Sequence, residues 1–484
     1  MQPIALVTLF ALFLAFSPNS RAATYYVATN GSDANPGTLA LPFATPQKAV
    51  ATNSALAAGD TVYVRGGTYV MNVQVKPNKT GAAGNPIKLW AYPGETPVFD
   101  FSGMGTTDKA LDVRRDYWHV RGLTVRKAPS NGIFVGGNGV IIENCVIHDC
   151  NNDGLVLGSS TLRATNALIL NCDSYRNYQA GSGGNNGDGF AAKDGCATGN
   201  AFIGCRAWDN ADDGWDFYNN NNNVLISNCW AFSNGYDLWG VGAGWTGNGN
   251  GFKLGGAGTT GRHTVIRSVA FDNRAKGFDH NNGVGAHWLH QNTGFRNGKW
   301  NFSFYDQPVN GNHDFRNNLS YLGQGGTNFI IATSVQVSNS WPAYTATAGD
   351  FVTLDAALAT AARNPDGALP DNGFARLASG SQFIDRGINL GLPFDGAAPD
   401  LGAFEVTAAA PQGPLTISTP ALINGNFQFT TSGLTAHGNV IVHSSTNLTH
   451  WQPIFTNPPV TGAWQFIDSN AAAHPQRYYR TEEK

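Results

Sequence analysis

Short apolar stretches separated by Asn and Gly turns recur from about residue 136 to about residue 335. Six segments share the pattern residue-x-x-aromatic-x-Asn, the first only loosely: 145–150, 172–177, 205–210, 229–234, 268–273 and 292–297. Their starts are 27, 33, 24, 39 and 24 residues apart. A second anchor, Gly followed by a large apolar residue, comes after each of the first five: Gly154-Leu155, Gly189-Phe190, Gly214-Trp215, Gly251-Phe252 and Gly277-Phe278. A repeat of this length predicts a solenoid.

The repeat unit is too short and too rich in β-branched residues for helix pairs, and it lacks the leucine spacing of a leucine-rich repeat. We therefore predict an all-β fold, a right-handed parallel β-helix. Coils ~4.8 Å apart place equivalent residues in rows. One row holds Cys145, Cys172, Cys205 and Cys229, and another holds Asn177, Asn210, Asn234, Asn273 and Asn297. The Asn row suits a turn with left-handed backbone and amide hydrogen bonds between coils.

The ends of the chain have a different character. Residues 4–16 form an apolar run too short to span a bilayer, and Ser20-Arg21-Ala22 follows as a cleavage site. We predict a signal peptide over 1–22 and a secreted protein, extracellular or periplasmic; a buried strand or an anchor is the alternative. Residues 46–58 are expected to form a short amphipathic helix that caps the open end of the solenoid.

The remaining boundaries follow from composition. Residues 23–407 are predicted to be the β-helix domain, closed by the segment near 371–405, and 408–414 a linker. Residues 415–484 alternate over short stretches between turns, which predicts a small β-sandwich module. In that module Trp451 or Trp464 could bind carbohydrate, although a core position is the more common one for tryptophan.

Charge and cysteine content limit the partners. The net charge is −3, which gives no basic surface for nucleic acid. We expect a monomer without a membrane span. Four of the six cysteines fall in one repeat row, so we predict free core thiols rather than disulfides. His287 and His290 are three residues apart, which places them on opposite faces of a strand and argues against a shared zinc site.

Acidic residues gather around the second anchor of neighbouring repeats. Asp212, Asp213 and Asp216 lie within one pentapeptide, and Asp188 and Lys253 occupy matching places in the repeats on either side. Two places after the glycine of the second anchor stand Asp216, Lys253 and Asp279. Side chains alternate along a strand, so these three residues are expected in one outward row. Ca²⁺ takes ~6 to 8 oxygen ligands, so converging carboxylates suggest a calcium site beside a base.

Two insertions lengthen the repeat next to these residues, at 178–187 and 236–249. Solenoid insertions map to loops on one face, so we predict that both wall a groove around the acids. Trp239 and Trp245 could stack on sugars there or pack within the loop.

The motifs Asn186-Gly187-Asp188-Gly189-Phe190, Asn210 to Asp216 (NADDGWD) and Asn250 to Gly256 (NGFKLGG) resemble family 9 of the polysaccharide lyases, the β-helical pectate lyases. The resemblance covers about residues 24–405 in architecture and about 186–281 in motifs. It implies that Asp188, Asp212, Asp213 and Asp216 hold a catalytic Ca²⁺ and that Lys253 is the base. The implied reaction is β-elimination in α-1,4-linked polygalacturonate, with an alkaline optimum because a free lysine has a pKa of ~10.4.

Other interpretations remain open at this level. Asp-Gly is a common turn pair, and Lys253 between two acids could form only a salt bridge. The polymer could be another uronate, such as alginate or a glycosaminoglycan. A pectin-type hydrolase would use paired carboxylates as acid and base without calcium or Lys253. A non-catalytic adhesin in which calcium stiffens one repeat belongs to a different class altogether.

Overall fold

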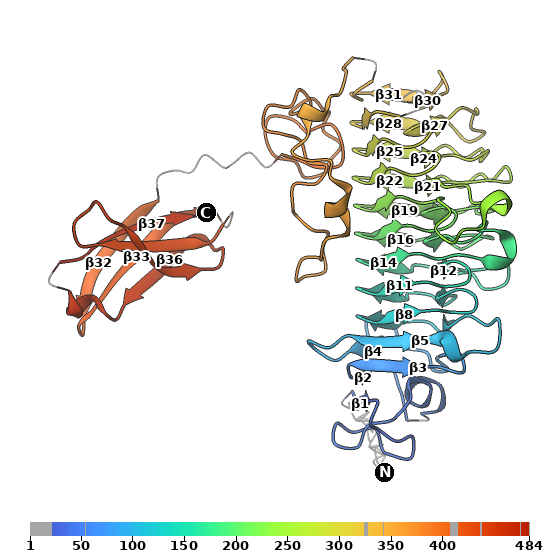
Figure 1. The fold of residues 1–484 in the computed structure, drawn as a ribbon, viewed down its shortest axis with the longest axis horizontal. Coiled ribbons are helices and arrows are strands. Elements are labelled where there is room, and N and C mark those ends of the chain that lie inside the picture. The colour runs from blue at the N-terminus through green and yellow to red at the C-terminus, as the bar shows by residue number, and fades with distance from the viewer. Residues whose placement is uncertain are drawn as a thin grey trace, which may run out of the picture. The chain divides into compact units, whose positions relative to one another are not determined.

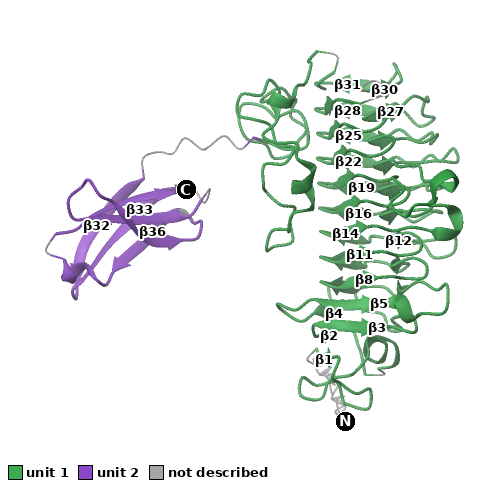
Figure 2. Ribbon diagram, in the orientation of Figure 1, with its two compact units in different colours: residues 1–405 green, residues 406–484 purple. Residues whose placement is uncertain are grey.

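The computed structural model describes residues 22–53, 55–323, 328–341, 343–406, 415–435, 438–474 and 476–483. The predicted linker and all but the last residue of the predicted signal peptide lie outside these ranges. The chain divides into two compact units, residues 1–405 and 406–484 (Figure 2). In the part of the chain that the structure describes, no helix is long and apolar enough to cross a membrane.

Three long sheets form the first unit, and strands of successive coils pair in parallel (Figure 1). The first sheet holds twelve strands: β1 (Thr24–Val27), β2 (Thr61–Val64), β4 (Ile87–Ala91), β7 (Trp118–Arg121), β10 (Ile141–Glu143), β13 (Leu168–Leu170), β16 (Asn200–Ile203), β19 (Val224–Ser227), β22 (Thr264–Ile266), β25 (Trp288–His290), β28 (Asp314–Arg316) and β31 (Val335–Val337). The second holds ten: β3 (Gly67–Val70), β5 (Pro97–Asp100), β8 (Thr124–Arg126), β11 (Val146–His148), β14 (Asp173–Tyr175), β17 (Arg206–Trp208), β20 (Trp230–Phe232), β23 (Val269–Phe271), β26 (Thr293–Phe295) and β29 (Leu319–Tyr321).

The third sheet holds nine strands: β6 (Leu111–Val113), β9 (Ile133–Val135), β12 (Leu155–Leu157), β15 (Phe190–Ala191), β18 (Trp215–Asp216), β21 (Phe252–Lys253), β24 (Phe278–Asp279), β27 (Phe302–Phe304) and β30 (Asn328–Ile330). In the middle of the solenoid each coil contributes one strand to each sheet, and the coils at the ends contribute to only one or two of them. This arrangement confirms the predicted parallel β-helix.

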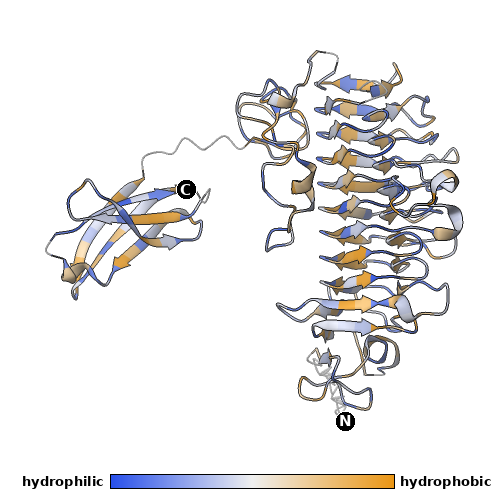
Figure 3. Ribbon diagram, viewed as in Figure 1, coloured by the Kyte–Doolittle hydropathy of each residue, from blue (hydrophilic) through white to orange (hydrophobic). Residues whose placement is uncertain are grey.

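Aromatic residues of the third sheet stack inside the solenoid. Phe190, Trp215, Phe252, Phe278 and Phe302 are fully buried, with successive ring centroids 4.9, 4.7, 5.0 and 4.8 Å apart. These distances match the spacing of neighbouring strands, so each ring packs on its equivalent in the next coil. The four cysteines of the predicted row are free and buried, as predicted, and so are Cys150 and Cys196, which the row did not include. Figure 3 shows the apolar residues concentrated on the strands of both units.

The predicted Asn row forms a ladder of buried amides. The Nδ2 of Asn177 donates to Oδ1 of Asn210 at 2.8 Å, and the pattern continues through Asn234, Asn273 and Asn297 at 2.8–3.0 Å. The left-handed backbone, however, belongs to the residue before each Asn, with φ between 50° and 56°: Arg176, Asp209, Ser233, Asp272 and Arg296. The amides are therefore selected for hydrogen bonding between coils, and their neighbours carry the turn.

The amino-terminal helix is shorter than predicted. Helical residues run over 46–52 only, beginning where predicted; within them η1 (Lys48–Thr52) buries Ala49 and Val50 against the first coils. It ends at Asn53, whose backbone is extended. Asp60 accepts a hydrogen bond from the backbone N–H of Ala57 at 2.9 Å, which fixes a turn where the helix was expected to continue.

The segment over 343–405 lies beside the coils instead of closing their end (Figure 1). It contains η5 (Ala348–Asp350) and η6 (Ala356–Thr360) and packs on the outer face of the second sheet. Phe374 contacts Trp230 and Phe271 with ring centroids 5.3 and 4.9 Å apart. At the last coil it is Trp341 that covers the interior, 5.1 Å from Phe302.

The second unit consists of two antiparallel three-stranded sheets, as predicted for a small β-sandwich. One is formed by β32 (Thr416–Ile423), β33 (Asn426–Thr435) and β36 (Thr461–Asp468), and the other by β35 (Gln452–Asn457), β34 (Val440–Ser445) and β37 (Tyr478–Glu483). Phe429, Val442 and Phe466 form its core, and Trp464 packs against them partly buried.

Three histidines form a ladder inside the first unit. The Nδ1 atoms of His263, His287 and His313 accept backbone N–H groups of the preceding coil at 3.1–3.2 Å, and the rings stack 5.3 and 5.5 Å apart. Their Nε2 atoms have no hydrogen-bond partner among the described residues. His290 points outward and lies 3.6 Å from Asp314, so His287 and His290 occupy opposite faces as predicted.

We expect the free energy of unfolding to fall steeply below about pH 6.5 because of this ladder. Burial lowers the pKa of His263 and of His313 to about 3 and also lowers that of His287. The unfolded chain therefore binds more protons than the folded chain between these values, so the stabilisation is complete above pH 6.5 and is lost on acidification. Each histidine contributes up to ~1.4 kcal/mol per pH unit.

Chemical denaturation at about pH 7.5, 6 and 5 measures this slope. His287→Asn keeps an acceptor for the backbone N–H of the neighbouring coil and removes one titrating group. We expect the slope of the variant to be smaller than that of the natural chain by about one proton. Equal slopes for the two proteins would contradict the assignment.

Candidate active site

A row of polar side chains follows the outer face of the third sheet. Asp216 pairs with Lys253, and Lys253 pairs with Asp279, each in register across neighbouring strands. The residues before them, Trp215, Phe252 and Phe278, point into the core. Alternation along β18, β21 and β24 therefore produces the predicted outward row.

Three of the four predicted carboxylates converge. Oxygens of Asp188, Asp213 and Asp216 lie within 4.8 Å of one another, and all three residues are buried. Asp188 and Asp213 each stand before a glycine at the entrance to a strand of the third sheet. A Cβ added to Gly189 would lie 2.7 Å from the Cβ of Ala207. The absence of a side chain there lets the backbone lie close to Ala207 of the second sheet.

Asp212 lies next to this group but has other partners. Its Oδ2 accepts the backbone N–H of Asn186 at 3.1 Å, and its Oδ1 accepts that of Asn248. These residues close the two insertions, so one carboxylate ties both loops to the coil. Burial and the nearby Asp188 raise the pKa of Asp212 to about 6. Its predicted role as a fourth ligand remains a prediction.

Lys253 contacts the cluster directly. Its Nζ lies 3.1 Å from Oδ2 of Asp213 and 3.1 Å from Oδ2 of Asp216. Asp279, which sequence register placed beside it, forms its ion pair with Lys276 at 2.9 Å. Burial by itself would lower the pKa of Lys253, but the surrounding carboxylates, led by Asp213 and Asp216, raise it well above its ordinary value. Without another cation, the amine is held as an ammonium.

A second lysine at the cluster was missed by sequence reasoning. Nζ of Lys193 lies 2.5 Å from Asp188, 3.3 Å from Asp216 and 3.5 Å from Asp153. Lys193 stands two residues after Ala191, which pairs with Asp216 in the outward row. Continuing the alternation past the end of the strand would have placed Lys193 on the same face.

The cluster carries a surplus of acid. Among the described residues, the five buried carboxylates of Asp153, Asp188, Asp212, Asp213 and Asp216 form ion pairs with only two cations, the ammonium groups of Lys193 and Lys253. Burial, with the charge of Asp212, raises the pKa of Asp213, and Oδ2 of Asp213 accepts no hydrogen bond from the described residues beyond its ion pair with Lys253. Buried carboxylates need compensation by a cation, and an all-oxygen donor set suits a hard one such as Ca²⁺. The residues present therefore fit a calcium ion.

The two insertions pack on each other. The ring of Tyr178 stacks 4.7 Å from Trp239 and 6.1 Å from Trp245. Thr246 donates its backbone N–H to the carbonyl of Gly183 at 3.1 Å. Of the two interpretations open for these tryptophans, the structure favours packing within the loops.

Two features define the class of this protein: its fold is a parallel β-helix, and one sheet of that β-helix carries a buried cluster of carboxylates and lysines. Residues 25–318 match the family model described as Pel9A-like, right handed beta helix region. This is more than half of the chain, so the chain belongs to that family, and the predicted right-handed solenoid and family resemblance are confirmed.

Similar proteins include enzymes with an assigned activity. Pectate lyase L of Dickeya chrysanthemi is 39% identical over 79% of this chain and 90% of its own length. Pectate lyase PEL9 of Emericella nidulans is 30% identical over 77% of this chain and 96% of its own length. The crystal structure of pectate lyase Pel9A superposes with a TM-score of 0.73 at 37% identity, covering 80% of this chain and 97% of that one. A rhamnogalacturonan lyase superposes with a TM-score of 0.67 at 32% identity, covering 74% and 97%.

Proposed function

We propose that this protein is a calcium-dependent pectate lyase that cleaves α-1,4-linked polygalacturonate by β-elimination. The observation that carries the proposal is the position of the Lys253 amine, 3.1 Å from two members of a buried carboxylate cluster. The names of the similar proteins support the same reaction class. Residues 23–407 would form the catalytic domain. The proposal also includes secretion, to the extracellular space or the periplasm, and a monomeric state.

Asp188, Asp212, Asp213 and Asp216 would hold the calcium ion. When bound, the ion would supply positive charge that neutralises these carboxylates and the acidic group of the substrate. Lys253 would remove the proton from C5 of the sugar, next to the C6 carboxylate. The electron pair left on C5 would form the double bond to C4 as the bond from C4 to the glycosidic oxygen breaks, and water would protonate the leaving oxygen. Its amine can act as a base only as far as the carboxylates beside it are compensated, because they favour the ammonium form. The cluster thus couples the base to cation binding.

The test is incubation of the protein with polygalacturonate, with and without a chelator, while ultraviolet absorbance of the unsaturated product is followed. We expect absorbance to rise and the chelator to suppress it. Reducing ends without absorbance would select a hydrolase instead. Absence of both products on polygalacturonate, with elimination on rhamnogalacturonan or alginate, would move the proposal to another polymer.

A further inference from the structure

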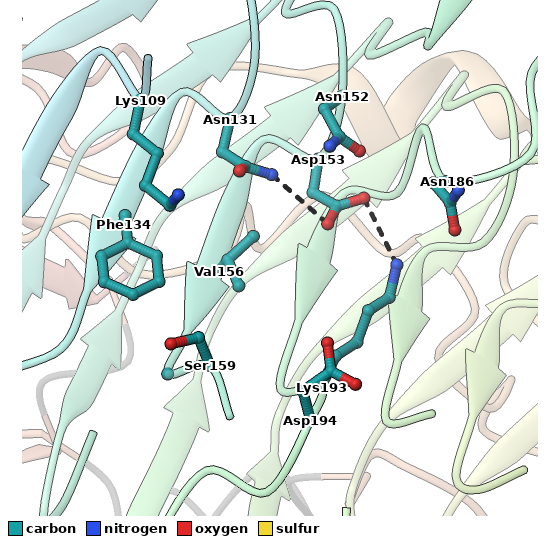
Figure 4. A pocket seen from close by; sticks show the side chains of 11 residues that line it. Lys109, Asn131, Phe134, Asn152, Asp153, Val156, Ser159, Asn186, Lys193 and Asp194 are labelled. Atoms are coloured by element: carbon teal, nitrogen blue, oxygen red, sulfur yellow. Dashed lines mark hydrogen bonds and ion pairs between the residues drawn. The ribbon is translucent and has the colours of Figure 1, made fainter. Parts of the chain in front are cut away.

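A pocket of about 260 Å³ lies beside the carboxylate cluster on the outer face of the third sheet. Figure 4 shows Lys109 and Phe134 on one side, Lys193 on the other and Val156 between them, with amide side chains along one edge. The pocket is continuous with the candidate active site, because Lys193 lines it and also contacts Asp188 and Asp216. Nothing in the proposed mechanism uses this pocket.

The pocket lies on the line of the catalytic row. Phe134 of β9 pairs with Val156 of β12, and Val156 pairs with Ala191 of β15. Ala191 in turn pairs with Asp216 of β18, so the outward row continues from Asp216 to Phe134. Strands ~4.8 Å apart place Val156 ~10 Å and Phe134 ~14 Å from Asp216 along this line. A polymer that follows the row across Lys253 therefore crosses the pocket a few sugar units away.

Lys109 is the cation of the pocket that has no acidic partner. It forms no ion pair with any residue that the structure describes, and its Nζ lies 4.9 Å from the centre of the Phe134 ring. The neighbouring Arg114 is paired with Asp112 at 2.7 Å, and Lys193 is paired with Asp153. Among the described residues, the positive charge of Lys109 is thus left without an acidic partner. It lies at the end of the pocket that is farthest from Asp216 along the row.

The acids of the pocket are already engaged. Asp153 contacts Lys193 at 3.5 Å and accepts a hydrogen bond from Asn131 at 3.5 Å. Asp194 is exposed and accepts a hydrogen bond from Asn219 at 3.1 Å. The Oδ1 of Asn152 is buried and lacks a hydrogen-bond partner in the described part of the chain. A ligand with a carboxylate would pair with Lys109, because the acids of the pocket are taken up by other partners.

We propose that this pocket is a subsite that binds a uronic acid residue of the substrate a few units from the cleaved bond, and that Lys109 recognises the carboxylate of that residue. The inference rests on the proposed function, since it assigns the pocket to the same polymer. Val156 and Phe134 provide the apolar floor on which the C–H face of a sugar ring can lie. Lys109 is accordingly a specificity-determining residue, remote from the reacting atoms.

The test is Lys109→Met, compared with Lys88→Met. Lys88 is a matched control, because it is also half-buried with its Nζ over an aromatic ring, that of Trp90 at 5.3 Å, but it belongs to the first sheet. On polygalacturonate we expect Lys109→Met to raise KM about tenfold with kcat unchanged, and Lys109→Arg to restore most of the affinity. Unchanged KM, or a loss confined to kcat, would overturn the inference.

Direct binding separates this inference from the proposed function. Calorimetry with hexagalacturonate and calcium, on protein that carries Lys253→Met to prevent turnover, measures the subsite without catalysis. Adding Lys109→Met should weaken binding about tenfold, whereas adding Lys88→Met should not. Equal affinity with and without Lys109 refutes the subsite even where the natural chain eliminates normally. An inactive natural chain whose hexagalacturonate binding still depends on Lys109 would refute the lyase proposal and leave the subsite supported.

Discussion

Lys253→Met is expected to lower kcat on polygalacturonate by about 10² to 10⁴, the contribution of a general base. The Nζ of Lys253 is the amine that lies 3.1 Å from both Asp213 and Asp216, and the side chain is buried. Methionine fills a similar volume without a titrating group. Calcium should bind the substrate-free variant at least as tightly as the natural chain, because one competing positive charge has been removed from the cluster.

The matched variant is Lys253→Arg, which keeps the positive charge but cannot lose its proton near neutral pH. It should be as inactive as the methionine variant, which separates the loss of a base from the loss of a charge. Because a lysine amine has an ordinary pKa of ~10.4 and is protonated at neutral pH, the rate of the natural enzyme should increase with pH. An arginine variant with near-normal kcat, or a flat rate from about pH 6 to about pH 10, would rule out Lys253 as the base.

The row of Asp216, Lys253 and Asp279 was predictable because a solenoid converts sequence register into spatial register. Once coils stack at one strand spacing, a residue's distance along the chain from the glycine of the second anchor determines its sheet, its face and its neighbours. The same logic gave the cysteine row, which runs through four successive repeats, and the amide ladder, which runs through five. In these parts of the chain, a residue's position within the repeat is enough to predict where it lies in the fold.

Contacts made by irregular segments could not be obtained in this way. Asp212 was grouped with the other acids by sequence proximity, yet its carboxylate binds backbone N–H groups at the ends of both insertions. Lys193 lies past the end of a two-residue strand, where alternation was not carried forward. The segment over 343–405 has no repeat, so its path along the second sheet depends on side-chain packing, such as that of Phe374 on Trp230.

Asp188→Asn is expected to weaken calcium binding at least about 100-fold, and activity at low calcium should fall in parallel. Asp188 is fully buried, and its Oδ1 accepts the backbone N–H of Asp213 at 2.9 Å. The amide oxygen of asparagine can keep that hydrogen bond, so the turn into β18 is preserved. The substitution removes one of the three negative charges that Asp188, Asp213 and Asp216 bring to the cluster. A hard cation depends on such charged oxygen ligands.

Calcium titration of the substrate-free protein by calorimetry measures this change without turnover. Asp279→Asn is the matched control, because Asp279 is equally buried on the same face but its ion pair is with Lys276, outside the cluster. High calcium should restore part of the activity of Asp188→Asn, since weaker binding is offset by mass action. If Asp188→Asn bound calcium as tightly as Asp279→Asn, these three carboxylates would not be the cation site, and the coupling between the cation and Lys253 would have no structural basis.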